Sequence, residues 1–406
     1  MNILDLREKR YNLYKKIGKN ILSIKANVMG EEKRNLYSNY VSYIFYNELK
    51  DNFKRPIIEF DSEGLIFIFE IDDKTHLLDL KKTLVDLEEN HPLGRLSDLD
   101  IISKDLREIS RSELGLGMRK CIICDSPAKY CSRSLKHSKE EFDKAFKNKV
   151  QKYIFTKDER IRLIEFCLLN ELMRNISLGT VNPTTCGSHS DMDIFTFFSS
   201  LDFLSKEFLR IKEINYNDFN SLKKLGIEME NKMLNITNGA NTHKGMIFHF
   251  LLILASILQE NSLEESRDRI KYLARFSFDK DFYNPCNKSY MRYNKNKVLG
   301  ARGEALKAYD FPYNLDLEEN NLDKAFLLLC NYSEDTNIIN RRGYEFYLSF
   351  KKKISSYLLG EITLDYLENF CLKNNISAGG SCDLVSIFIF YKLLRFNYKN
   401  FKEVLL

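Results

Sequence analysis

Asp98 and Asp100, two residues that could take part in catalysis, stand two positions apart in the segment 91–100, which also contains a Pro/Gly turn. On a β-strand, residues two apart face the same side, so the carboxylates of Asp98 and Asp100 would lie close together. Mg²⁺ prefers one or two carboxylates together with phosphate oxygens, and Arg95 would hold remaining phosphate charge. The spacing alone fits either this site or two surface acids on a solvated strand edge, because D-x-D is common.

A second cluster combines thiols with basic residues. Its potential metal ligands are Cys121, Cys124, Cys131 and His137. These residue types bind zinc, although their spacing matches no standard zinc finger. The basic residues beside them are Arg119, Lys120, Arg133 and Lys136. The pattern leaves two interpretations: a zinc site, or buried thiols next to a basic patch that binds phosphate.

A third polar motif, 187–193, precedes an apolar-periodic helix and contains His189, Asp191 and Asp193. Ser190 is the expected N-cap of that helix. Either the acids take part in chemistry, or Asp191 only complements the helix dipole. On a regular helix the two aspartates would point about 200° apart, so sharing one Mg²⁺ requires an irregular helix start.

A glycine-bearing loop, 238–245, leads into an apolar helix. Such a loop offers free N–H groups and the positive end of the helix dipole to an anion. His243 and Lys244 add side-chain donors, and Thr242 is the expected capping residue. The motif lacks the Walker pattern, so it predicts either a triphosphate cradle or a capped helix with a surface lysine.

Later polar positions occur in small-residue or turn-like stretches. The segment 300–305 places Arg302 and Glu304 among small residues, which allow a ligand or a helix to approach closely. The segments 335–337 and 377–383 look like N-caps, and the second ends in Asp383. Simple helix capping competes with a functional role for both turns.

The elements that position these motifs fall into two groups. The first part has helical patterns at 13–20, 32–49 and 73–89, strand patterns at 56–60 and 65–71 joined by a hairpin turn, and an apolar strand at 99–102. Later the helical patterns dominate, most clearly at 158–174, 191–211, 242–260 and 322–330. We therefore predict an α+β domain over residues 1–154 and an all-α domain over 155–406.

Composition limits the class of protein. The 406 residues are 44% hydrophobic, the net charge is only +5, and the start of the chain lacks the apolar core of a signal peptide. The apolar run 248–258 is too short to cross a bilayer. Nine cysteines without an export signal suggest reduced thiols. We expect a cytoplasmic protein that binds neither membrane nor nucleic acid.

Four motifs in order carry a resemblance over roughly residues 1–154: His91-Pro-Leu-Gly-Arg-Leu-Ser-Asp-Leu-Asp-Ile, Ile109-Ser-Arg-Ser-Glu-Leu-Gly-Leu, Arg119-Lys-Cys-Ile-Ile-Cys and Cys131-Ser-Arg-Ser-Leu-Lys-His. They resemble the citrate lyase apo-acyl-carrier-protein phosphoribosyl-dephospho-CoA transferase family. The resemblance implies nucleotidyltransferase-like chemistry, in which a serine of the acyl carrier protein attacks a phosphate and pyrophosphate leaves. Asp98 and Asp100 would be catalytic and hold Mg²⁺, and Arg95, Arg119 and Arg133 would bind phosphate. Ser97 departs from the family, which has a large aromatic there.

Three further motifs carry a second resemblance over about 155–406: Leu178-Gly-Thr-Val-Asn-Pro-Thr-Thr-Cys-Gly-Ser-His-Ser-Asp-Met-Asp, Asn241-Thr-His-Lys-Gly and Gly300-Ala-Arg-Gly-Glu-Ala. They resemble the triphosphoribosyl-dephospho-CoA synthase family. That reaction joins the anomeric carbon of ATP to a ribose hydroxyl of dephospho-CoA and releases adenine, through a transition state like an oxocarbenium ion. The implied catalytic acids are Asp191, Asp193 and Glu304. The implied substrate-binding residues are His189, Asn241, His243, Lys244, Arg302 and Asp383.

The two resemblances support each other, because the second half would make the compound that the first half consumes. We expect a bifunctional transferase that uses ATP and dephospho-CoA as substrates, Mg²⁺ as cofactor and the citrate lyase acyl carrier protein as partner. The alternatives are the equivalent role for malonate decarboxylase, a non-catalytic carrier-protein docking module, and a regulatory nucleotide sensor.

Overall fold

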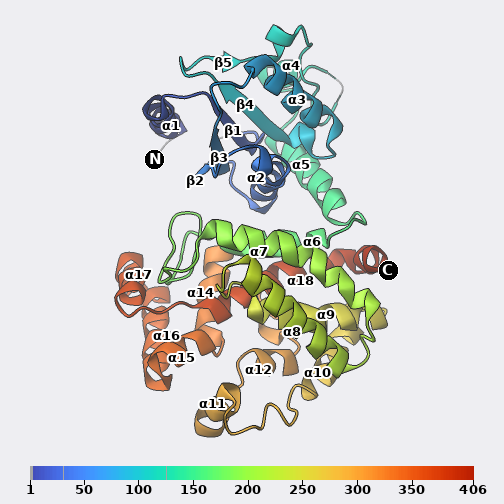
Figure 1. Cartoon of the computed structure of the whole chain (residues 1–406), viewed down its shortest axis with the longest axis vertical. Coiled ribbons are helices and arrows are strands. Elements are labelled where there is room, and N and C mark those ends of the chain that lie inside the picture. Colours follow the sequence, from blue (N-terminus) through green and yellow to red (C-terminus); the bar gives the residue numbers. More distant parts are fainter. Residues whose placement is uncertain (1–2, 31, 125) are drawn as a thin grey trace. The chain divides into compact units, whose positions relative to one another are not determined.

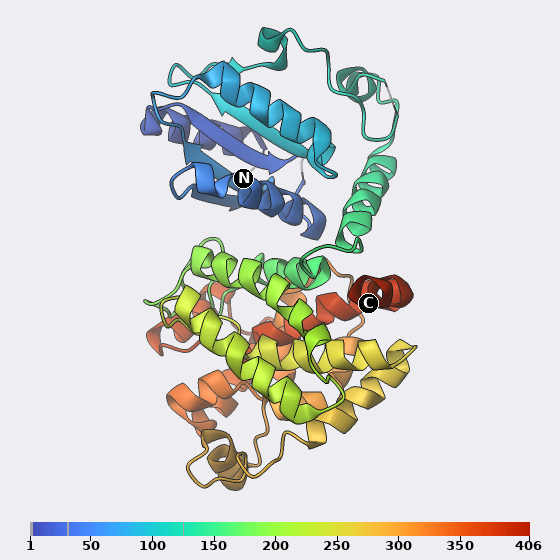
Figure 2. The same cartoon turned by 45° about the vertical axis from the view of Figure 1, so that its right-hand side comes forward.

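The computed structural model describes residues 3–30, 32–124 and 126–406 (Figure 1). The chain separates into two units, with the division between Ile154 and Phe155, and each unit has its own core. Strands occur only in the first unit as far as the chain is described, and helices dominate the second (Figure 2). The expected order of an α+β part and a mostly helical part is therefore confirmed.

An antiparallel sheet organises the N-terminal unit. Its strands are β1 (Ile21–Ala26), β2 (Ile57–Asp61), β3 (Gly64–Glu70), β4 (Ser97–Ile102) and β5 (Glu108–Ile109), in the order β2-β3-β1-β4-β5. The predicted hairpin is β2–β3, paired from Ile57 with Ile68 to Asp61 with Gly64. Strand β1 was not expected, because the sequence analysis assigned no element between residues 20 and 32.

The helices of this unit are α1 (Ile3–Ile17), α2 (Leu36–Leu49), α3 (Leu77–Asn90), α4 (Ala128–Arg133) and α5 (Lys139–Ile154). Helices α2 and α3 pack on one face of the sheet, α2 against β1 and β3 and α3 against β4. On the other face, Leu13, Tyr14 and Ile17 of α1 pack against Ile21 and its buried neighbours. This leaves the β4 end of that face available for polar side chains.

The C-terminal unit is built from thirteen helices over its described residues. They are α6 (Arg162–Leu172), α7 (Ile194–Glu207), α8 (Phe219–Ile236), α9 (Lys244–Gln259), α10 (Leu263–Arg275), α11 (Lys288–Asn296), α12 (Ala301–Leu306), α13 (Asp310–Asn314), α14 (Leu322–Tyr332), α15 (Thr336–Arg342), α16 (Tyr344–Leu358), α17 (Leu364–Lys373) and α18 (Gly379–Leu405). Among the described helices, none is both long enough and apolar enough to cross a membrane.

Helix α9 is the centre of this unit. It packs against α8, α10, α12 and α18, and nearly every residue from Met246 to Leu258 is buried. A helix that is apolar all round must be covered on all sides, so its start is held firmly in place. The residues at that start, Lys244 and Gly245, are therefore presented from a rigid element.

Helix α7 begins later than expected. Asp193 is its N-cap, and its Oδ1 accepts hydrogen bonds from the backbone N–H groups of Phe195 and Thr196, each at 3.0 Å. The expected cap Ser190 lies outside the helix. Helix α9 also differs at its start: Oδ1 of Asn241 accepts from the N–H of Lys244 at 3.3 Å, while Thr242 donates its hydroxyl to Ser200.

Candidate active sites

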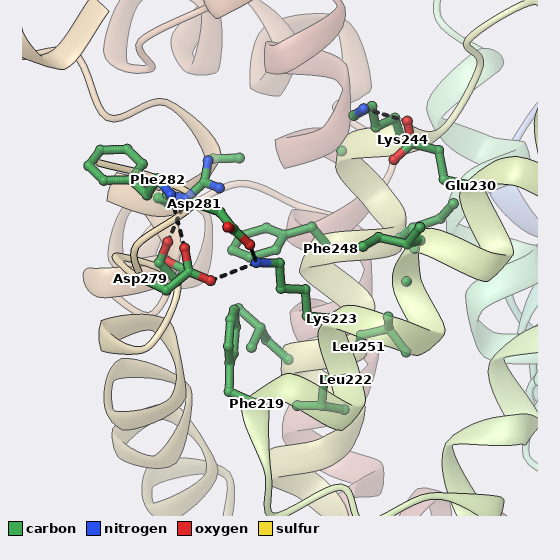
Figure 3. Close-up of a pocket in the computed structure, with 18 of the residues that line it drawn as sticks. Phe219, Leu222, Lys223, Glu230, Lys244, Phe248, Leu251, Asp279, Asp281 and Phe282 are labelled. Carbon is green, nitrogen blue, oxygen red and sulfur yellow. Dashed lines mark hydrogen bonds and ion pairs between the residues drawn. The ribbon is translucent and has the colours of Figure 1, made fainter. Parts of the chain in front are cut away.

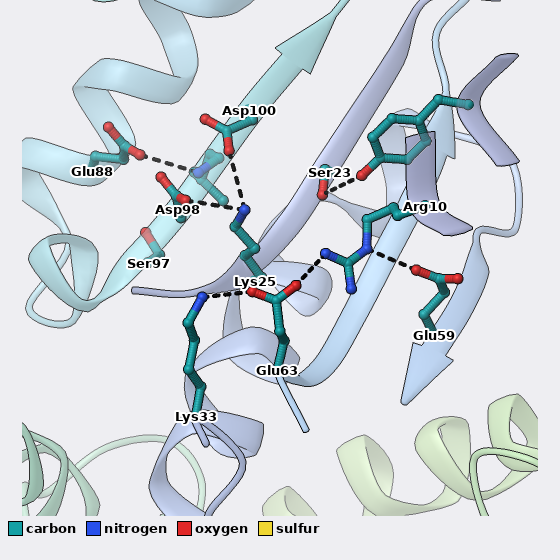
Figure 4. Close-up of polar contacts among 12 residues, drawn as sticks. Arg10, Ser23, Lys25, Lys33, Glu59, Glu63, Glu88, Ser97, Asp98 and Asp100 are labelled. Carbon is teal, nitrogen blue, oxygen red and sulfur yellow. Dashed lines mark hydrogen bonds and ion pairs between the residues drawn. The ribbon is translucent and has the colours of Figure 1, made fainter. Parts of the chain in front are cut away.

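The register of two strands brings a lysine to the paired aspartates. Strands β1 and β4 pair with Lys25 opposite Asp98 and Ser23 opposite Asp100. Because β4 alternates, its two carboxylates share one face while Leu99 and Ile101 point into the core. Nζ of Lys25 lies 3.4 Å from Asp98 and 3.7 Å from Asp100 (Figure 4). The two acids are together, as predicted, and share a cation that the sequence did not indicate.

The two carboxylates have different electrostatic environments. Burial and the charge of Asp98 raise the pKa of Asp100 to about 7. Burial also opposes ionisation of Asp98, but the charges of Lys25 and Arg119 outweigh it and lower the pKa of Asp98. The pair thus keeps one firmly ionised carboxylate and has room for more positive charge. That environment suits a divalent cation or the phosphates bound to one.

Arg119 links the aspartates to a neighbouring basic cavity. Its guanidinium donates to the carbonyl of Ser97 at 2.6 Å and to Asp98 at 3.3 Å, and it lies 3.4 Å from Glu88. The same arginine lines a cavity of about 310 Å³. The basic side chains of that cavity are Arg7, Lys33, Arg95, Arg119 and Lys120.

Such a cavity can bind a polyphosphate beside the carboxylates. Of the predicted phosphate ligands of this unit, Arg95 and Arg119 line it. Arg133 does not, because it is exposed on α4. Arg7, Lys33 and Lys120 were not among the predicted phosphate ligands. Apart from their positive charge, nothing in the sequence indicates that they line one cavity.

The departure at Ser97 has a local explanation. Its side chain is fully buried at the start of β4, and its hydroxyl donates to the carbonyl of Gly94 at 2.9 Å. The backbone of Glu88 would collide with a Cβ at Gly94. This turn is therefore filled by backbone, and a small hydroxyl side chain fits it.

A cavity of about 360 Å³ lies beside the N-terminal end of α9 (Figure 3). Lys244 and Arg302, which come from motifs far apart in the sequence, both line it. Lys244 pairs with Glu230, and Arg302 donates its Nε–H to the carbonyl of Ser277 at 3.1 Å. The structure thus brings together two of the predicted triphosphate ligands.

The lining of this cavity also includes a second lysine, which is held by two acids. Nζ of Lys223 lies 2.6 Å from Asp279 and 2.5 Å from Asp281. Sequence analysis missed all three residues, because no sequence motif indicates that Lys223 of α8 pairs with Asp279, which lies 56 residues later in a loop. The cavity also has apolar walls, formed by Phe219, Leu222, Phe248, Leu251 and Phe282. The cavity can therefore bind a molecule that combines a flat heteroaromatic ring with negatively charged groups.

His243, a predicted ligand of the triphosphate, lies outside the lining of this cavity. Its side chain is buried, its Nδ1 lies 2.7 Å from the hydroxyl of Ser200, and its ring packs edge-on against Phe197. Burial lowers the pKa of His243 to about 3, so the ring is neutral at ordinary pH. It can orient the loop through Ser200, but it adds no positive charge to the cavity.

Several predicted residues lie outside the lining of this cavity: His189, Asp191, Asp193, Asn241, Glu304 and Asp383. The carboxylate of Asp193 is used as a helix cap, which explains its position without any chemistry. Nε2 of His189 lies 3.0 Å from the hydroxyl of Ser377, and its Nδ1 lies 3.7 Å from Asp191. This His189 group is separate from the residues that line the cavity.

Glu304 has the properties of a proton acceptor. It is buried, its Oε1 lies 3.9 Å from Lys307, and its Oε2 has no hydrogen-bond partner within the described part of the chain. Burial raises the pKa of Glu304 to about 7. Arg302, two residues earlier on α12, lines the cavity, but Glu304 does not, because residues two apart on a helix point in nearly opposite directions.

Asp383 meets the start of α9 directly. A Cβ at Gly245 would collide with the Asp383 carboxylate, so the glycine of the Asn241-Thr-His-Lys-Gly motif is needed for this close approach. Burial, with the charges of Glu171 and Asp335, raises the pKa of Asp383. The residue therefore packs against the element that carries Lys244.

Comparison with known proteins gives two family matches. Residues 1–153 match the family described as apo-citrate lyase phosphoribosyl-dephospho-CoA transferase, and residues 158–310 match that described as ATP:dephospho-CoA triphosphoribosyl transferase. Similar proteins include Protein CitXG of Haemophilus influenzae, 27% identical over 97% of this chain and 96% of the relative. Protein CitXG of Leuconostoc mesenteroides subsp. cremoris is 26% identical over 96% of each chain.

The C-terminal part also has separate relatives. The 2-(5''-triphosphoribosyl)-3'-dephosphocoenzyme-A synthase of Haemophilus ducreyi is 28% identical over 66% of this chain and 98% of its own length. One chain thus matches two transferase families in succession, in the same order as the full-length CitXG relatives. The protein therefore joins a member of the CitX family and a member of the CitG family in one chain, and is a bifunctional transferase of citrate lyase prosthetic-group biosynthesis.

Proposed function

We propose that the cavity beside α9 is the synthase site, where ATP reacts with dephospho-CoA. The observation that carries this proposal is that Lys244 and Arg302, from two separate family motifs, line one cavity with Lys223. Their charges suit the triphosphate, and Phe248 and Phe282 suit the adenine ring. The anomeric carbon of ATP gains a bond to the dephospho-CoA ribose oxygen and loses its bond to adenine. We propose that Glu304 is the general base, which accepts the proton of the attacking hydroxyl.

The same proposal places phosphoryl transfer beside β4. The basic cavity that contains Arg95 and Arg119 receives the triphosphoribosyl group. The serine oxygen of the citrate lyase acyl carrier protein forms a bond to the phosphorus nearest the ribose, and the bond from that phosphorus to pyrophosphate breaks. Asp98 and Asp100 orient the reacting groups together with Lys25 and Arg119, and one of the two aspartates accepts the proton of the serine hydroxyl. This chemistry depends mainly on positioning and on neutralising charge.

The residues beside β4 fit a Mg²⁺ ion. Asp98 and Asp100 would hold it, because they are two partly exposed carboxylates on one strand face, and burial together with the charge of Asp98 raises the pKa of Asp100. When bound, the ion would polarise phosphate oxygens and stabilise charge on the leaving pyrophosphate. Lys25 already supplies one positive charge at this place and would do so with or without the ion.

One incubation tests the whole sequence of reactions. The chain is mixed with ATP, dephospho-CoA, Mg²⁺ and apo-acyl carrier protein of citrate lyase, adenine is quantified, and the carrier's intact mass is measured. Adenine release together with a phosphoribosyl-dephospho-CoA adduct on the carrier is the expected result. A docking module would give neither product, and a nucleotide sensor would bind ATP without releasing adenine. Faster modification of a malonate decarboxylase carrier would support that partner instead.

Variants assign the two sites. Asp98→Asn or Asp100→Asn should abolish carrier modification, while adenine release continues because the second site is intact. The exposed Asp105 provides the matched control: Asp105→Asn should retain both activities. Full carrier modification by Asp98→Asn and Asp100→Asn would exclude the paired aspartates as the transferase site.

A further inference from the structure

Three thiols and one imidazole converge in the loop region after β5. The three Sγ atoms of Cys121, Cys124 and Cys131 and a ring nitrogen of His137 all lie within 4.8 Å of one another. Sγ of Cys124 is 3.5 Å from Sγ of Cys131 and 3.3 Å from Nε2 of His137. Tetrahedral zinc with ordinary Zn–S and Zn–N bonds keeps its ligand atoms roughly 3.5–3.8 Å apart. The number and chemistry of these atoms fit tetrahedral zinc, the separations of 3.5 Å and 3.3 Å from Cys124 are close to its ligand spacing, and no pair lies more than 4.8 Å apart.

The backbone is shaped to hold the ligands. Lys120 and Pro127 form an antiparallel bridge, and the N–H of Cys121 donates to the carbonyl of Ser126 at 2.8 Å. Inside this small hairpin, the N–H of Ile123 donates to Sγ of Cys121 at 3.4 Å. An N–H donor pointing at sulfur stabilises the thiolate form, which is the form that binds a metal. Helix α4 begins directly after the hairpin and carries Cys131.

Other uses of these residues explain less. A disulfide between Cys124 and Cys131 needs sulfurs about 2.05 Å apart and would leave the convergence of Cys121 and His137 without a reason. Iron–sulfur clusters are usually held by four cysteines. The buried-thiol interpretation does not explain a histidine nitrogen at hydrogen-bond distance from a thiol. Nζ of Lys136, 3.7 Å from Sγ of Cys124, would offset the net negative charge of zinc with three thiolates.

We propose that Cys121, Cys124, Cys131 and His137 bind one Zn²⁺ in a closed structural site that positions Arg119. Four protein ligands fill a tetrahedral zinc, so the ion has no open position for catalysis. Arg119 precedes Cys121 by two residues, and its carbonyl accepts from the N–H of Ala128 at 2.8 Å. The same residue contacts Asp98 and lines the basic cavity. The zinc assignment stands without the proposed function, and only the positioning role of Arg119 rests on it.

Metal content is the primary test. The full chain, purified without a histidine tag or chelator, should contain about one zinc per chain by elemental analysis. Cys124→Ser and His137→Ala should lose it. Cys286→Ser removes an exposed cysteine outside the cluster and should retain it. His137→Cys should also retain zinc, because four thiolates still form a tetrahedral site. Titration of the wild-type thiols with an organomercurial should release the zinc as the cluster reacts.

The outcomes separate the zinc site from its role. Absence of zinc from folded wild-type protein, iron in its place, or a Cys124–Cys131 disulfide in the non-reduced mass would each overturn the assignment. Full zinc in Cys124→Ser would do the same. For the role of Arg119, Cys124→Ser should lower carrier modification by roughly tenfold or more with supplied triphosphoribosyl-dephospho-CoA, while adenine release stays at the parental rate. If Cys124→Ser harms both activities, His137→Cys decides: retained zinc and transferase activity support the proposal, and lost zinc overturns it.

Discussion

Lys25 lies directly opposite Asp98 in the β1–β4 pair, and its ammonium group stands 3.4 Å from that carboxylate and 3.7 Å from Asp100. A similar arrangement occurs in the C-terminal unit, where Lys223 bridges Asp279 and Asp281. In both places two acids separated by one residue are held by a lysine from another element. Each candidate site therefore has an internal cation that keeps paired carboxylates in place before any substrate binds.

Lys25→Met should lower carrier modification by about ten- to a hundredfold, because it removes a charge-assisted contact of roughly 1.5–3 kcal/mol beside the reacting phosphates. Adenine release should not change. The assay is the rate of carrier modification with supplied triphosphoribosyl-dephospho-CoA. Lys19, an exposed lysine paired with Glu70 in the same unit, is the matched control, and Lys19→Met should keep the parental rate. A parental rate for Lys25→Met would show that Lys25 only stabilises the sheet.

Lys244→Ala should weaken ATP use in adenine release by about ten- to a hundredfold, by the same conversion from one lost charge-assisted contact. Carrier modification with the supplied intermediate should remain. Lys232 on α8 is also an exposed lysine with a glutamate partner, so Lys232→Ala serves as the control. Normal adenine release across ATP concentrations would mean that Lys244 is an ordinary surface lysine. Equal loss of both activities would indicate misfolding, which a melting curve would reveal.

The synthase reaction should become faster as pH rises through about 7. Burial raises the pKa of Glu304 to about 7, and only the ionised carboxylate can accept the hydroxyl proton. Glu304→Gln should remove this limb of the kcat/KM profile for adenine release together with most of the activity. Glu264→Gln, at a surface position on α10, should leave the limb in place. A pH profile unchanged in Glu304→Gln would exclude Glu304 as the base.

Glu304 should also affect stability with a definite sign. Its folded pKa is raised above the ordinary value of 4.5, so its contribution to stability is fully present below about pH 4.5 and is lost as pH rises through about 7. Glu304→Gln cannot ionise, so the variant should gain stability relative to the parent over that interval. Chemical unfolding followed at several pH values measures the difference, and an unchanged or opposite trend would contradict a buried, proton-holding Glu304.

A buried ionic group should make the N-terminal unit sensitive to acid. Arg10 of α1 contacts Glu63 at 2.5 Å and Glu59 at 2.8 Å, and Lys33 contacts Glu63 at 2.6 Å (Figure 4). Burial opposes ionisation of Glu63, but hydrogen bonds from Lys33 and Arg10 outweigh it and lower the pKa of Glu63 to about 2. This stability is present above about pH 4.5 and is lost as pH falls toward 2.

Glu63→Gln should therefore destabilise the unit by roughly 1.5–3 kcal/mol at neutral pH, because it removes the charge that Arg10 and Lys33 share, while Arg10 keeps its contacts with Glu59 and Asp61. The destabilisation should shrink between about pH 4.5 and 2. Hydrogen exchange of β2 and β3, measured at pH 7 and about pH 2.5, reports on this unit separately from the helical one. Equal exchange in parent and variant at pH 7 would show that the ionic group contributes little.

The sequence could predict features that depend on local patterns. The alternation of β4 was enough to place Asp98 and Asp100 on one face, and the apolar pattern of 242–260 was enough to identify the central helix. Lys25 could not be predicted, because it meets the aspartates only through the pairing of strands more than 70 residues apart. The helix start near 190 was misread because serine and aspartate are both good caps, and only tertiary packing selected Asp193.

Gly245 is a point of contact between segments far apart in the chain, where the Asp383 side chain of α18 lies against the first turn of α9. An acidic side chain of the protein therefore occupies the space where an anion would otherwise approach that turn. Under the proposed function, affinity for the triphosphate comes from the side-chain cations of Lys244, Lys223 and Arg302, which line the cavity. A side-chain cation can change its rotamer as the ribose moves away from adenine, whereas a fixed row of backbone amides would hold the phosphates in one place. In this reaction the triphosphate stays on the transferred sugar, so ligands that can adjust with the sugar suit it better than fixed ones.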